Sequence, residues 1–70
     1  MAKREYADKL RFLLPHWIEH TNEHAEEFRD WSDKTTLGKQ DILSAATHFD
    51  VAAHALEAAL EKLGGLVEKI

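Results

Sequence analysis

Residues 42–63 read ILSAATHFDVAAHALEAALEKL, with an apolar side chain at alternating steps of four and three residues. These positions are Ile42, Ala46, Phe49, Ala53, Leu56, Leu60 and Leu63. Such spacing is typical of the seam of a helix that packs lengthwise against another helix. A second row of small side chains would let a neighbouring helix approach closely: Ala45, Ala52, Ala55 and Ala59. We therefore predict a helix over about residues 38–63, ended by Gly64 and Gly65.

Upstream of this helix, Asp33, Thr35 and Thr36 are residue types that favour turns and helix caps, and Gly38 offers another cap. They predict a loop over about residues 33–37. Before the loop, apolar side chains again recur at helical steps, which predicts a first helix over about residues 3–32. Its stripe is Tyr6, Leu10, Leu14, Trp17, Ile18, Thr21, Ala25 and Phe28. Two long helices joined by a short loop predict an all-α fold, an antiparallel helical hairpin.

Pro15 interrupts the first helix. A proline ring removes one backbone donor, crowds the carbonyl of Arg11 and disfavours helical geometry at Leu14. The helix is therefore expected to be kinked or split at Pro15. We favour the kink, because the apolar stripe keeps its phase across the proline.

The size of the chain bears on its assembly. Seventy residues make one domain, 1–70, with a short tail over residues 64–70, and a chain this short buries only about 60% of its unfolded surface. It has no cysteine, so it has no disulfide or thiolate metal site. Two helices cannot enclose a core. We therefore predict a homodimer or higher homo-oligomer in which paired hairpins form a four-helix bundle, and a protein partner would serve the same end.

Charge and hydropathy exclude several functions. The formal net charge is −4, from 13 acidic and 9 basic residues, and the basic residues are scattered rather than clustered. No nucleic acid is expected as a partner. No run approaches about 20 apolar residues, and no signal peptide follows Met1, so we expect no membrane association and a cytoplasmic location.

The chemistry of the chain is concentrated in the first predicted helix. His16, His20 and His24 are spaced four residues apart, and Glu19, Glu23 and Glu27 follow the same period. Residues four apart lie above one another on one helix face. The pattern therefore predicts a strip of imidazoles and carboxylates of the kind that first-row transition metals bind.

The hairpin adds a fourth imidazole. If the turn centres near residues 35–36, facing residue numbers sum to about 71 or 72, which places His48 level with His24. We predict a metal site from His20 and His24, then His16 and His48, with Glu27 as the carboxylate. These donors suit zinc, nickel, cobalt, copper or iron rather than Ca²⁺ or Mg²⁺. His54 falls on a more polar face and is excluded.

The leading functional hypothesis is thus a small metal-binding protein for metal sensing, storage or delivery. The alternative is a non-catalytic structural or protein-interaction module in which the histidines are incidental. Bis-histidine haem binding between His24 and His48 is a weaker third reading. No catalytic triad, phosphate-binding loop or His-Glu-x-x-His motif occurs, which argues against an enzyme.

Residues 13–29, LLPHWIEHTNEHAEEFR, carry one resemblance. The segment resembles a motif of small uncharacterised prokaryotic helical proteins, in which a Pro-His-Trp-x-x-His core precedes an alanine-rich, acidic helix. This resemblance covers most of the chain. It implies a helical hairpin and brings no established activity.

Overall fold

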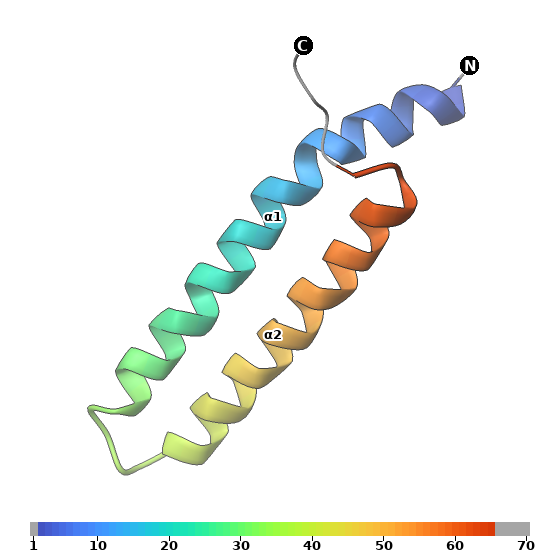
Figure 1. Cartoon of the computed structure of the whole chain (residues 1–70). Helices are drawn as coiled ribbons and strands as arrows, with labels where there is room; N and C mark the ends of the chain where they lie inside the picture. The colour runs from blue at the N-terminus through green and yellow to red at the C-terminus, as the bar shows by residue number, and fades with distance from the viewer. Residues whose placement is uncertain (1, 66–70) are drawn as a thin grey trace.

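The chain folds as two long antiparallel helices (Figure 1), in a computed structural model that describes residues 2–65. Helix α1 comprises Ala2–Ser32 and helix α2 comprises Lys39–Lys62. The predicted all-α helical hairpin is confirmed. Of the predicted tail, residues 66–70 lie outside the described part of the chain.

Helix α1 is continuous through Pro15. The proline therefore does not split it into two helices, and the kink at this residue stays a prediction. Leu14, immediately before the proline, is buried. The apolar stripe thus keeps contact with α2 at this point even though Pro15 provides no amide proton to the preceding turn.

The loop between the helices uses small side chains and backbone bonds. Backbone amides of Asp33 and Lys34 donate to the carbonyls of Arg29 and Trp31, at 3.2 Å and 3.0 Å, and so close the last turn of α1. Gly38 precedes α2 in the left-handed conformation, with φ of 74°, and its carbonyl accepts the amide of Ile42 at 3.0 Å. Gly38 is therefore the cap of α2, where a side chain would be strained.

The end of α2 is tied to α1. Gly65 N–H donates to the carbonyl of Leu60 at 2.9 Å, and Gly64 N–H donates to that of Glu61 at 3.1 Å. This pair of bonds is the Schellman arrangement, which glycines with positive φ allow. Arg11 Nε then donates to the carbonyl of Gly65 at 2.9 Å. The predicted glycine stop is thus also a contact between the two helices.

The core of the hairpin is a thin line of small side chains. Its buried residues are Leu14, Ala25 and Ser32 on α1 and Ala46 and Ala53 on α2. The larger seam residues of α2, such as Phe49 and Leu56, are half-buried. Small residues let the helix axes approach, and in the part of the chain that the structure describes the two helices form a single pair with no further layer over the larger side chains. Within residues 2–65, neither helix is apolar over a length that would cross a membrane.

Candidate functional site

The predicted histidine strip lies exposed on α1. The rings of His16 and His20 are in edge-to-face contact, with 4.4 Å between their centroids. The helix alone produces this contact, because its pitch stacks side chains four residues apart. His16 and His20 are therefore two solvent-accessible imidazoles held side by side without help from α2.

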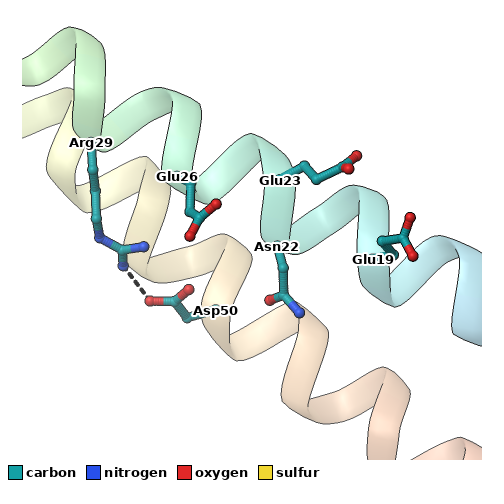
Figure 2. A pocket seen from close by; sticks show the side chains of 6 residues that line it. All are labelled: Glu19, Asn22, Glu23, Glu26, Arg29 and Asp50. Atoms are coloured by element: carbon teal, nitrogen blue, oxygen red, sulfur yellow. Dashed lines mark hydrogen bonds and ion pairs between the residues drawn. The ribbon is translucent and has the colours of Figure 1, made fainter.

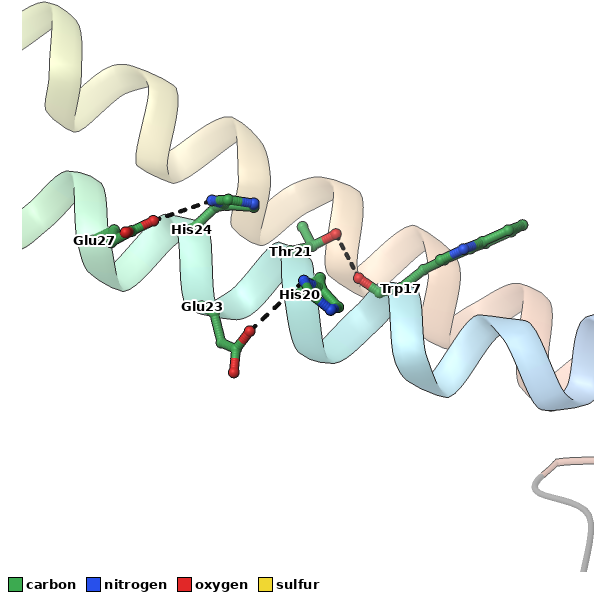
Figure 3. Close-up of polar contacts among 6 residues, drawn as sticks. All are labelled: Trp17, His20, Thr21, Glu23, His24 and Glu27. Carbon is green, nitrogen blue, oxygen red and sulfur yellow. Dashed lines mark hydrogen bonds and ion pairs between the residues drawn. The ribbon is translucent and has the colours of Figure 1, made fainter.

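Carboxylates accompany the strip one turn further along the helix (Figure 3). The Nδ1 atom of His24 lies 3.2 Å from Glu27 Oε1, and that of His20 lies 3.8 Å from Glu23 Oε1. All four side chains are more than half exposed, so these pairs contribute little to stability. Their effect is on orientation, because a carboxylate at Nδ1 leaves Nε2 facing outward.

His24 also reaches the second helix. Its ring centroid lies 6.1 Å from that of Phe49, nearly perpendicular to it, and 6.4 Å from that of Phe28. Phe28 and Phe49 are 5.1 Å apart in turn. Such aromatic pairs prefer offset and edge contacts at these separations. His24 is therefore part of a small aromatic cluster at the boundary between α1 and α2.

His48 does not join His24 in this structure. Its Nδ1 lies 2.7 Å from the backbone carbonyl of Ser44 on its own helix, and the side chain is exposed. Since a carbonyl only accepts, Nδ1 is the donor in this contact, and Nε2 is the ring nitrogen not engaged by it. The residue that meets His24 is Phe49, about 100° further around α2. The predicted level of His24 along α2 is correct to one residue, because Phe49 follows His48 directly. The rotation of α2 about its axis, however, turns His48 outward.

The structure thus brings His16 beside His20 and His24 beside Glu27, but it does not gather the whole predicted set. Within the described range, no three His, Asp or Glu side chains are close enough together to hold a metal ion. His54, which the sequence excluded, is exposed and lies 3.3 Å from Glu57 through its Nδ1.

One cross-helix contact had no signal in the sequence pattern. Arg29 of α1 forms an ion pair with Asp50 of α2, and Figure 2 shows the guanidinium reaching over to the carboxylate. A shallow pocket beside the pair is lined by Glu19, Asn22, Glu23, Glu26, Arg29 and Asp50. Neither partner follows a motif. Only the rotation of the two helices brings them together on the side of the hairpin opposite His24.

Comparison with known proteins places this arrangement in a family. The family model described as Domain of unknown function (DUF8180) matches residues 10–63, which include the histidine strip and all of α2. A relative from Archaeoglobus fulgidus, named "Uncharacterized protein", is 38% identical over 52 residues. The aligned region covers 74% of this chain and 69% of that protein. No solved structure matches the chain. The predicted likeness to small helical proteins is confirmed at this level, and the Pro-His-Trp-x-x-His motif stays a prediction.

Proposed function

This chain belongs to the family described as Domain of unknown function (DUF8180), and we propose that it is a small helical module that binds a divalent transition metal. The ion would be held by the histidine strip of α1, for metal sensing, storage or delivery. The observation that supports this proposal best is the contact between His16 and His20, at 4.4 Å between ring centroids. Two imidazoles one helical turn apart are a recurrent zinc-binding arrangement.

The tautomers favour the same chemistry. His20, His24 and His48 each direct Nδ1 toward an oxygen, from Glu23, Glu27 and the Ser44 carbonyl respectively. Metal-bound histidines usually donate one ring N–H to such an oxygen while the other nitrogen coordinates. The outward Nε2 atoms are therefore the proposed donors. Imidazole nitrogen with carboxylate oxygen suits zinc, nickel, cobalt, copper or iron.

A single strip supplies two well-placed imidazoles, so the proposed site at His16 and His20 is completed by water, by Glu23 after a change of rotamer, or by a second chain. Glu27 lies about 10 Å further along the helix axis than His20, so it would serve as the carboxylate for His24. We propose a homodimer in which two hairpins form a four-helix bundle. We also propose that α1 bends at Pro15, because the proline ring crowds the preceding turn.

Thermal unfolding with and without metal tests the site. Zn²⁺, Ni²⁺, Co²⁺ or Cu²⁺ at 100 times its dissociation constant should stabilise the folded chain by about 2.7 kcal/mol. The double variant His16→Ala/His20→Ala should weaken metal affinity more than about tenfold. Loss of a residue that only supports a metal ligand already lowers affinity by about that factor. His54→Ala is the matched control, because it also removes an exposed histidine on a helix. Equal metal responses in both variants would reject this site.

A second candidate function is a non-catalytic interaction module. The observation that favours it is the exposure of large apolar side chains on a hairpin with a thin core, among them Trp17 and Trp31. If no transition metal shifts the unfolding of the native protein, this candidate replaces the first.

A further inference from the structure

The two sides of the hairpin differ in chemistry. Successive residues of a helix are about 100° apart around its axis. On α1, one side of the buried Leu14 carries four residues at about 60° to 100° from it: Leu13, Trp17, His24 and Trp31. Contacts between the helices show which sides correspond. His24 touches Phe49 of α2, so Phe49 belongs to this side, and the Arg29–Asp50 ion pair marks the other. We call Leu13, Trp17, His24, Trp31 and Phe49 the aromatic face.

The aromatic face is exposed. Trp31 is 61% exposed, Trp17 is 42% and Leu13 is 40%. Apolar residues scattered singly on a surface need no explanation, but several aligned on one face of a hairpin indicate a contact surface. Phe49 continues the surface onto α2, where it is half-buried between the helices.

We propose that the aromatic face is the docking surface for a second copy of this chain. This inference deepens the dimer of the proposed function by naming its interface, and it does not depend on metal. A twofold interface brings each patch against itself, so a charge near the twofold axis would meet its own copy, and an uncharged patch avoids that repulsion.

The aromatic face meets this requirement. The α1 positions in its sector carry no Lys, Arg, Asp or Glu: they are Tyr6, Leu13, Trp17, His24 and Trp31. The neighbouring sector of α2 holds Ala45, Phe49, Ala52 and Leu56, also without charge. The nearest charged groups border this sector rather than lie in it, and they include Lys9 and Glu27 on α1 and Asp41 on α2. Glu27 is bonded to His24, and Lys34 Nζ lies 4.5 Å from the ring centroid of Trp31.

The accessible area is that of a chain with one face still to be covered. The isolated hairpin exposes 5772 Å². A compact monomer of 8.0 kDa would expose about 4,450 Å², so the excess is roughly 1,300 Å². A standard interface buries about 800 Å² on each partner. The excess is thus large enough for one such interface.

The docked arrangement leaves the metal proposal testable by itself. His24 would be covered by the partner, whereas His16 lies about 160° from the buried line of α1 and stays outside the interface. The chain can therefore dimerise without binding metal at His16 and His20, or bind metal there without dimerising, and the two experiments distinguish these cases.

Sedimentation equilibrium of the full chain over a wide concentration range, with metal chelated, tests the interface. We expect a monomer–dimer equilibrium. Trp17 and Trp31 are the two tryptophans of the chain, so their fluorescence should shift to shorter wavelength as the dimer forms. Trp31→Ser should weaken the dimer at least tenfold, because tryptophan is among the residue types whose loss costs most at protein interfaces. Phe12→Ser is the matched control: Phe12 is 63% exposed on the same helix but about 160° from the buried line, and its loss should leave the dissociation constant unchanged.

Two results would overturn the proposal. One is a chain that stays monomeric over the whole concentration range. A monomer whose aromatic face binds another protein or a lipid vesicle belongs to this outcome. The other is a dimer whose dissociation constant is unchanged by Trp31→Ser. Should Trp31→Ser lose helicity by circular dichroism, Leu13→Ser provides the same test on the same face. If Phe12→Ser weakens the dimer as much as Trp31→Ser does, the interface is not the aromatic face, although the unsubstituted chain is still a dimer.

Discussion

Replacing Ala46 with leucine tests how closely the helices approach. Ala46 of α2 is 0% exposed, and Ala25 of α1 is 1% exposed. A larger side chain at residue 46 has no free space, so it must take a strained rotamer or push the helices apart. Overpacking of this kind costs about 1–3 kcal/mol.

The expected change is large for so small a protein. The entropy of unfolding near the midpoint is about 2.1 cal/mol/K per residue, or roughly 150 cal/mol/K for 70 residues. A loss of about 2 kcal/mol therefore lowers the midpoint by roughly 13 °C. Thermal unfolding followed by circular dichroism measures this shift, at one fixed protein concentration because self-association raises the midpoint.

Ala55→Leu is the matched control for Ala46→Leu. Ala55 is exposed on the same helix, and leucine and alanine have similar helix propensities, so the control should change stability by under about 0.5 kcal/mol. A close approach of the helices at Ala46 would be contradicted by either of two results. Ala46→Leu would be as stable as the unsubstituted chain, or both variants would lose the same stability.

Two further substitutions have expected outcomes. Gly64→Ala should destabilise the hairpin by about 1–2 kcal/mol in urea unfolding, because Gly64 has a φ of 105° that a side chain disfavours; an unchanged midpoint would contradict the Schellman ending of α2. A double-mutant cycle of Arg29→Ala and Asp50→Ala should give a coupling of about 0.2–1 kcal/mol that falls in high salt, because both side chains are about two-fifths exposed. A coupling of zero at low salt would mean that the pair does not hold the helices in register.

Much of the hairpin was predictable because its signals are local. The steps of four and three residues from Ile42 to Leu63 predicted α2, and the pair Gly64 and Gly65 predicted its end. The stripe of α1 kept its phase through Pro15, and the helix is continuous there. Periodicity, turn chemistry and glycine conformation act within a few residues, so a single sequence is enough to recognise them.

The candidate site was predictable in part. The contact between His16 and His20 follows from helical spacing alone, and so do the pairs that His20 and His24 make with Glu23 and Glu27. The pairing of His24 with His48 required knowledge of how α2 is rotated about its axis. Here Phe49 takes that place, and His48 turns back to the carbonyl of Ser44.

Helix positions, their ends and the side-by-side imidazoles of α1 are therefore properties of the primary structure, because each arises from interactions within one or two turns. The rotation of α2, the Arg29–Asp50 contact and the uncharged aromatic face with Trp17 and Trp31 arise only when the helices meet. A rotation of one residue, about 100°, exchanges a buried position for an exposed one. That choice is made by which small side chains, Ala25 with Ala46 and Ala53, let the two helix surfaces come closest.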